Sequence, residues 1–261
     1  RIMNFASQSN SLIMQHAEDN ILSRNGLINE GEISTRLGLK GIPFLAEKII
    51  VQRDLSFLEE YFCRYHISQI SSSKTISIIK KAKKEGKVFT TGVSINNLSL
   101  NENDIGDFKT FLKLSPPLRT ETDRNALVQG LNDETIDVIV SDHKPEDEEN
   151  KRLTFAQAET GASGIETLLP LSLELYHNGS VELETIIKAL TSKPAEILKI
   201  NKGNLSIGND ADFCIVDINK PWVVRKEKLI SKSKNTPIED KKLQGKVIST
   251  FVNGEELFKS E

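Results

Sequence analysis

The sequence contains few cysteines, no long apolar run and almost no excess of charge of either sign. Its two cysteines, Cys63 and Cys214, lie far apart in apolar or mixed segments. We expect two buried free thiols of a reducing cytoplasm, with a disulfide between them as the alternative. We find no apolar run of about 18 residues and no signal peptide, which favours a cytoplasmic protein without a membrane partner. The net charge of −3 provides no basic surface for nucleic acid.

The length and composition fit one large globular domain. The chain has 261 residues, of which 38% are apolar and 27% charged, enough for a hydrophobic core. A (β/α)8 barrel has about 250 residues, so the length also allows one. The first residue is Arg1 rather than Met, and the chain opens inside a predicted helix over residues 1–10. We therefore expect the C-terminal part of a longer protein.

Strand and helix patterns alternate along the first half of the chain. Short runs rich in β-branched residues predict strands at 12–15, 65–71, 88–94 and 136–140. Apolar spacing predicts helices at 44–64, around Ile76, Ile79 and Ala82, and at 120–131. Residues 20–41 and 144–155 are predicted loops, and Gly86 is expected to end the second helix. This alternation predicts a parallel sheet, and four such units make half of a (β/α)8 barrel; an open four-unit sheet is the alternative.

The residues beyond position 200 have a different pattern. Runs at 205–216, 246–252 and 255–258 predict strands, and Asn253-Gly254 is a strong hairpin signal between the last two. We predict an α/β fold, with the C-terminal half of a TIM-like barrel in residues 1–200 and a small β-sandwich appendage in residues 201–261. The lysine-rich stretch 225–242 is predicted to be a solvated loop, with a binding role as the alternative.

Polar side chains follow two of the predicted strands. Ser141-Asp142-His143 follows the strand at 136–140, and His16 follows the strand at 12–15. In a (β/α)8 barrel the carboxyl ends of the strands carry the chemistry, so we expect these side chains to meet there. Histidine and aspartate are ligands of Zn²⁺, and the arrangement predicts a metal hydrolase. A helix N-cap or a salt-bridge partner is the alternative for Asp142.

Several motifs, taken in order and spacing, resemble the dihydroorotase branch of the amidohydrolase superfamily over essentially the whole chain. The motifs are His-Ala-Glu-Asp at 16–19, Asn-Glu-Gly at 29–31, Gly-Leu-Lys-Gly-Ile-Pro at 38–43, Ser-Pro-Pro-Leu-Arg at 115–119, Ser-Asp-His at 141–143, Gly-Ile-Glu-Thr-Leu-Leu-Pro at 164–170 and Pro-Ala-Glu-Ile-Leu at 194–198. Each motif alone has low specificity, whereas their combined order is specific.

The resemblance implies a distorted (β/α)8 barrel with a β-sandwich built from both chain ends. This chain would carry the last four barrel strands, and a preceding half would carry a His-x-His pair and a bridging acid. The resemblance also implies zinc as the cofactor of an active enzyme, with His16 and Asp142 as metal ligands and Asp142 as the general base. The residues implied in substrate binding are Asn96, Ser115, Arg119 and His143. For Arg119 a loop salt bridge is the alternative.

Several positions depart from the family pattern. Gln69 stands where the family has a metal-binding histidine, and a neutral amide is a poor zinc ligand. His66 does not replace it, because its side chain, three residues earlier on the strand, points to the opposite face; we expect a core or interface histidine. Asn96 and Ser115 replace other family residues, and Glu146 replaces a later histidine.

Two functional hypotheses follow from this resemblance. The first is a dihydroorotase, a zinc-dependent cyclic amide hydrolase of de novo pyrimidine biosynthesis that interconverts dihydroorotate and N-carbamoyl-aspartate. The second is a catalytically inactive homologue without a cofactor, which acts as a structural partner of aspartate carbamoyltransferase. The retained His16 and Asp142 favour the first hypothesis, and the changed positions favour the second. Another cyclic amidohydrolase, such as an allantoinase or hydantoinase, is a third hypothesis, and we expect a homo-oligomer.

Overall fold

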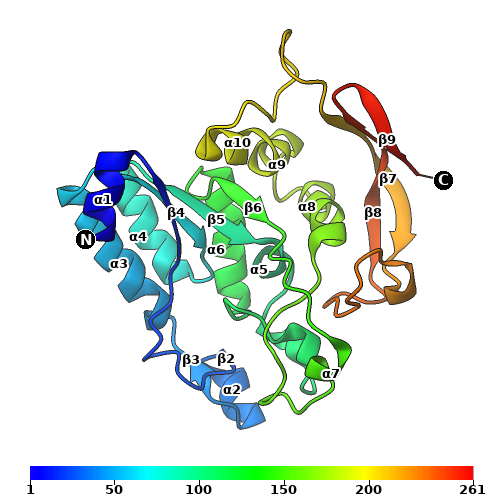
Figure 1. Ribbon diagram of the computed structural model, residues 1–261. Coiled ribbons are helices and arrows are strands. Elements are labelled where there is room, and N and C mark those ends of the chain that lie inside the picture. The colour runs from blue at the N-terminus through cyan, green and yellow to red at the C-terminus, as the bar shows by residue number, and fades with distance from the viewer. Residues whose placement is uncertain (261) are drawn as a thin grey trace.

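The fold is built on a parallel sheet, as the alternating pattern predicted. The computed structural model describes residues 1–260. The strands of this sheet are β1 (Leu12–His16), β4 (Arg64–Gln69), β5 (Thr90–Ser94) and β6 (Val138–Val140). They pair in parallel in the order β1-β4-β5-β6, so strands that follow one another along the chain are neighbours (Figure 1). Ile67 and Val93 are fully buried in the core on this sheet.

Helices connect the strands of the parallel sheet. The helices of this part are α1 (Ile2–Ser9), α3 (Leu45–Glu60), α4 (Ser73–Lys84), α5 (Ile95–Ser99) and α6 (Glu121–Asn132). α4 begins where the Ser72 hydroxyl accepts a hydrogen bond from the backbone N–H of Lys74. It ends before Gly86, whose φ of 86° is a left-handed conformation that glycine adopts easily, as predicted. Ile79 and Ala82 form part of its buried face.

Some predicted boundaries are wrong. The helix predicted at 44–64 is α3, and it ends at Glu60. Tyr61 has an extended backbone (φ −119°, ψ 102°), and Arg64 already begins β4. The two predicted loops contain short elements: β2 (Ile28–Asn29), α2 (Glu32–Leu37), β3 (Gly41–Ile42) and α7 (Glu148–Lys151). Strands β2 and β3 pair with each other in parallel, a contact between distant positions that local patterns do not predict.

The C-terminal region has the predicted antiparallel appendage. Three helices follow the parallel sheet, α8 (Leu168–His177), α9 (Leu183–Leu190) and α10 (Ser192–Leu198). The sheet β7 (Phe213–Val223), β8 (Lys242–Val252) and β9 (Glu255–Lys259) comes next. It lies on the far side of α8 from the parallel sheet (Figure 1). The predicted hairpin at Asn253-Gly254 joins β8 to β9 and is confirmed. The domain boundary at residue 200 stays a prediction.

The segment between β7 and β8 is not the solvated loop that its lysines predicted. We call residues 224–241 the strap. Val224, Asn235, Thr236 and Ile238 are all buried in it, whereas Lys226, Lys228 and Lys232 are exposed. The prediction was wrong because the lysines alternate with side chains that pack onto the body of the protein.

The two cysteines are free, as expected. Their predicted burial is wrong, since Cys63 is partly exposed and Cys214 on β7 is exposed. Burial raises the pKa of the Cys63 thiol above its ordinary value. Within residues 1–260, no helix combines the length and the apolar character that crossing a membrane requires.

Candidate functional site

The carboxyl ends of the four parallel strands bring together the side chains that we call the strand-tip site: His16, Gln69, Ser94 and Asp142. His16 ends β1, Gln69 ends β4, Ser94 ends β5, and Asp142 lies two residues after β6. The register pairs His16 directly with Gln69, beside an irregularity between Gln15 and His16. This arrangement agrees with the expectation from the sequence that His16 and Asp142 lie at one edge of the sheet.

Asp142 is held by hydrogen bonds from the ends of β4 and β5. Its Oδ1 accepts a hydrogen bond from Gln69 Nε2 at 2.7 Å, and its Oδ2 accepts one from Ser94 Oγ at 3.4 Å. Its backbone has a φ of 48°, a left-handed conformation that aspartate tolerates better than most residues. Burial raises the pKa of Asp142 above its ordinary value, and the hydrogen bonds from Gln69 and Ser94 partly oppose this. Asp142 is therefore a carboxylate with an elevated pKa that the protein itself stabilises.

His16 is paired with a carboxylate from its own loop. His16 Nε2 lies 3.1 Å from Glu18 Oε2, and Ser115 Oγ lies 3.4 Å from both of these atoms. The hydrogen bond with Glu18 raises the pKa of His16, and the same bond lowers the pKa of Glu18. The His16 side chain is 41% exposed, so water reaches this pair. The structure thus brings Ser115 to the site, and it adds Glu18.

His143 contacts the loop that follows it. Its Nδ1 accepts hydrogen bonds from the backbone N–H groups of Gly164 (3.1 Å) and Ile165 (3.3 Å). In the neutral ring the proton is then on Nε2, because Nδ1 serves as the acceptor. His143 also forms a parallel bridge with Ala162. The substrate-binding role of His143 stays a prediction.

Asn96 is not accessible in this structure. It is 1% exposed at the start of α5, where its backbone N–H donates to Ser94 Oγ at 3.2 Å. Its Nδ2 finds no hydrogen-bond partner among residues 1–260. The geometry therefore does not support the predicted substrate contact of Asn96, because the side chain has no exposed surface to offer.

Arg119 lies in a buried polar network instead of a substrate pocket. Arg119 is 4% exposed, and its guanidinium donates to Ser71 Oγ (2.7 Å), Asn29 Oδ1 (2.8 Å) and the backbone oxygen of Ile42 (3.3 Å). Ser71 in turn donates from its backbone N–H to Glu47 Oε2 at 2.8 Å. In this structure the arginine joins the segment after β4 to β2 and β3, and its substrate-binding role stays a prediction.

His66 has the core position that its place on β4 predicted. It is buried, and its Nδ1 lies 2.8 Å from Thr90 Oγ1 on the neighbouring strand. Burial lowers the pKa of His66 below its ordinary value, which favours the neutral ring. His66 therefore belongs to the packing of the sheet.

The described strand tips supply two of the donors that a catalytic zinc ion would need. Among residues 1–260, no three or more His, Cys, Asp or Glu side chains are grouped so that they could hold a metal. A catalytic zinc usually takes three protein ligands. His16 and Asp142 supply two donors, and the Gln69 amide is turned to Asp142 as a hydrogen-bond donor. The metal-ligand roles of His16 and Asp142 stay predictions.

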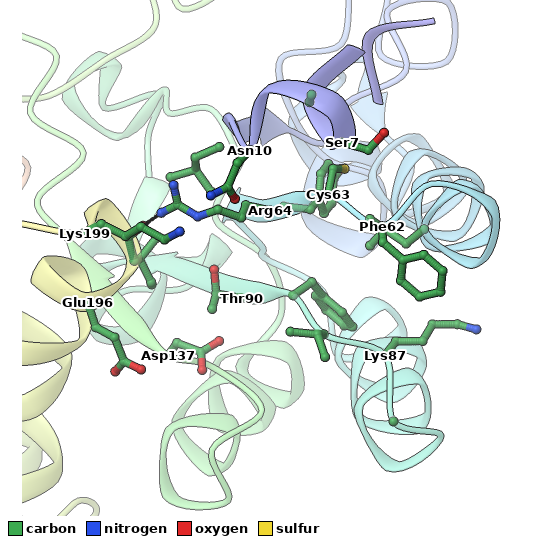
Figure 2. Close-up of a pocket in the computed structure, with 18 of the residues that line it drawn as sticks. Ser7, Asn10, Phe62, Cys63, Arg64, Lys87, Thr90, Asp137, Glu196 and Lys199 are labelled. Atoms are coloured by element: carbon green, nitrogen blue, oxygen red, sulfur yellow. Dashed lines mark hydrogen bonds between the residues drawn. The ribbon is translucent and has the colours of Figure 1, made fainter. Parts of the chain in front are cut away.

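A large cavity lies at the opposite end of the sheet. Its volume is about 690 Å³, and it lies where β4 and β5 begin, between α1 and α10. Figure 2 shows Arg64, Thr90, Asp137, Glu196 and Lys199 around it. None of the four strand-tip residues lines this cavity. Its position at the amino ends of the strands separates it from the candidate site.

Comparison with known proteins confirms the predicted resemblance. The model of the amidohydrolase family matches residues 1–257. The chain is 44% identical over 253 residues to a dihydroorotase of Ehrlichia canis, covering 97% of this chain and 57% of that protein. It is 41% identical over 261 residues to a dihydroorotase of Syntrophus aciditrophicus, covering 100% of this chain and 61% of that protein. The chain thus spans about three fifths of the length of these relatives.

A solved structure shows the same fold. The L-hydantoinase of Arthrobacter aurescens superimposes with a TM-score of 0.89 at 24% sequence identity, covering 99% of this chain and 59% of the hydantoinase. A dihydropyrimidinase of Brevibacillus agri superimposes with a TM-score of 0.87 at 21% identity, with the same coverage. At this level of identity the likeness concerns the fold, and it confirms the TIM-barrel class that the βα alternation predicted.

Proposed function

The chain belongs to the amidohydrolase family, and we propose that it serves the dihydroorotase reaction, the interconversion of dihydroorotate and N-carbamoyl-aspartate. In the hydrolytic direction, water adds across the C–N bond of a cyclic amide. The carbonyl carbon gains the hydroxyl, and the released nitrogen gains a proton. The dihydroorotases of Ehrlichia canis and Syntrophus aciditrophicus support this proposal, since their alignments cover 97% and 100% of the chain at 44% and 41% identity.

The residue that we assign to proton transfer is Asp142. Its carboxylate lies at a strand end, and burial raises its pKa, which makes it a better base than an exposed aspartate. In the proposed reaction it accepts a proton from the attacking water and returns it to the leaving nitrogen. Gln69 at the end of β4 and Ser94 at the end of β5 hold the carboxylate in place. The position of Asp142 among the strand tips is the observation that carries the proposal.

The experiment is a dihydroorotate hydrolysis assay on the full-length protein, with and without added Zn²⁺. Asp142→Asn is expected to lower kcat/KM by about 100-fold or more, the usual contribution of a general acid–base group. The matched control is Asp147→Asn, an exposed aspartate at the start of α7, whose substitution is expected to change little. Equal activity of the two variants would remove Asp142 from the mechanism.

A second candidate function is favoured by one specific observation. The amide of Gln69 occupies an oxygen of Asp142, and no three His, Cys, Asp or Glu side chains among residues 1–260 are grouped so that they could hold a metal. We therefore also consider a non-catalytic homologue that acts as a structural partner of aspartate carbamoyltransferase. This candidate predicts a folded protein with no turnover at any zinc concentration. It also predicts a stable complex with the aspartate carbamoyltransferase of the same organism, measurable by size-exclusion chromatography with light scattering.

A further inference from the structure

The strap carries a buried amide far from the sheet to which the strap belongs. The strap connects β7 and β8 of the C-terminal sheet, yet Asn235 in its middle is 2% exposed and lies against the loops that follow β6. A buried side-chain amide requires hydrogen-bond partners, because leaving its donor or acceptor unsatisfied costs about 1–3 kcal/mol. The partners of Asn235 therefore show which segments its position fixes.

Asn235 contacts two separate loops. Its Oδ1 accepts hydrogen bonds from Ser163 Oγ at 2.9 Å and from the backbone N–H of Glu146 at 3.3 Å. Its Nδ2 donates to the backbone oxygen of Gly161 at 3.1 Å. Its backbone oxygen accepts a further bond from the N–H of Ser163 at 3.2 Å. One residue of the strap thus joins the segment just after Asp142 to the segment at 161–163.

Two further contacts hold the strap in the same place. Ser233 Oγ donates to the backbone oxygen of Glu146 at 2.5 Å. The carboxylate of Glu166 accepts hydrogen bonds from the backbone N–H groups of Ile230 and Ser231, both at 2.9 Å. The strap is therefore attached at Ile230, Ser231 and Ser233 as well as at Asn235, and these contacts do not involve the exposed lysines.

The loops that Asn235 joins are the ones that orient His143. The backbone N–H of Lys144 donates to the oxygen of Ala162 at 2.8 Å, next to the bridge between His143 and Ala162. The N–H groups of Gly164 and Ile165 donate to the His143 ring. A shift of the loop at 161–165 would therefore move the two donors that set the orientation of the imidazole, beside the left-handed backbone of Asp142.

We propose that Asn235 is a positioning residue, through which the strap of the C-terminal sheet fixes the His143 ring and the turn at Asp142. It acts through the loops and does not touch the strand-tip side chains. Only the kinetic part of its test rests on the proposed dihydroorotase function. The contacts themselves are independent of whether the protein turns over a substrate.

The experiment compares Asn235→Leu with Thr236→Val in the full-length protein. Leucine has nearly the shape of asparagine, but its side chain can neither donate nor accept a hydrogen bond. Thr236 is the matched control, since it is equally buried in the strap and its hydroxyl has only a local contact, with the N–H of Ile238. Asn235→Asp keeps the acceptor oxygens and loses the donor, so its effect should be intermediate.

The first measurement is amide hydrogen exchange followed by mass spectrometry. We expect Asn235→Leu to accelerate exchange about tenfold or more in peptides covering 141–147 and 160–166, the size expected for about 1.4 kcal/mol of lost interaction. Peptides of β5 and α6 should be unchanged, and Thr236→Val should leave all of these regions as in the native protein. Uniform acceleration over the whole chain, or no difference between the two variants, would overturn the proposal.

The second measurement observes the His143 ring directly. We expect its ¹⁵N resonances to lose the signature of an Nδ1 acceptor in Asn235→Leu and to keep it in Thr236→Val. If the protein hydrolyses dihydroorotate, Asn235→Leu should also lower kcat about tenfold with little change in KM. An inert native protein would refute the proposed function but leave the exchange and ring measurements decisive for Asn235. Unchanged ring resonances in Asn235→Leu would refute the positioning role.

Discussion

The substitution Gln69→His tests whether one side chain separates this site from a zinc site. Gln69 ends β4 directly beside His16, and its amide bonds to Asp142. An imidazole at position 69 would raise the number of zinc donors at the strand tips from two to three. Three protein ligands are the usual complement of a catalytic zinc ion. The variant should therefore bind zinc at this place more tightly than the native chain does.

The magnitude follows from two opposing effects on stability. Without zinc, the variant loses the charge-assisted hydrogen bond to Asp142, which costs about 1.5 kcal/mol for a half-buried pair. For a chain of this size, 1 kcal/mol shifts Tm by about 2–4 °C, so the metal-free variant should melt about 3–6 °C below the native protein. Zinc at a hundred times its Kd stabilises the folded state by about 2.7 kcal/mol, or about 5–11 °C. Zinc should thus more than restore the loss.

The assay combines thermal unfolding, with and without Zn²⁺, and the zinc content of the protein after dialysis. The matched control is Gln15→His, the same substitution on β1 at a side chain that lines a separate pocket with Asp54 and Tyr65. It should neither retain zinc nor gain stability from it. The reasoning is refuted if a folded Gln69→His variant behaves like Gln15→His, because the loss of the metal site would then extend beyond position 69.

Two further predictions concern buried charges away from the site. Arg119→Lys should lower the free energy of unfolding by about 3 kcal/mol in a denaturant titration, because lysine lacks the planar fork that reaches both Ser71 and Asn29. The exposed control Arg152→Lys should lose less than about 0.5 kcal/mol. A loss as small as this for Arg119→Lys would contradict the prediction. Burial lowers the pKa of Lys151 to about 8. Between pH 8 and about 10.4 the native state has then released a proton that the unfolded chain still binds, so stability rises with pH. The native protein should gain about 2 kcal/mol over Lys151→Met between pH 7 and pH 9.5, measured by urea unfolding, and parallel stability curves would refute the assignment.

The sequence predicted the parallel sheet because its signals are local. β-Branched runs bounded by polar segments mark the strands, and Gly86 marks a helix end by its own conformational freedom. The pairing of β2 with β3 and the burial of the strap were not predicted, because both arise from contacts between distant residues. The strap shows why composition misleads: Lys226, Lys228 and Lys232 are exposed as predicted, while Asn235 is buried. No periodic pattern distinguishes such an amide from a solvated one.

The meeting of His16, Gln69 and Asp142 was predictable, because the carboxyl ends of parallel strands lie on one edge of a sheet. The partner of each side chain was not predictable. Glu18 is two residues from His16, a spacing equally consistent with a capping role, and only the folded loop turns its carboxylate to the imidazole. Arg119 shows the same limit more strongly. It is four positions from Ser115, which lies at the site, yet its guanidinium is buried among loop residues.

The role of Gln69 determines how the two candidate functions differ physically. A buried carboxylate needs compensation for its charge, and in metal hydrolases the ion provides it. Here the chain provides it with neutral donors, the amide of Gln69 and the hydroxyl of Ser94. Neutral donors stabilise the ionised carboxylate less than a divalent cation does, which is consistent with the raised pKa of Asp142. Such a carboxylate retains the capacity to accept a proton even where zinc coordination is lost. In the hydrolase a second group besides Asp142 activates the water, and in the structural partner no such group is present. The zinc dependence of dihydroorotate hydrolysis measures that difference.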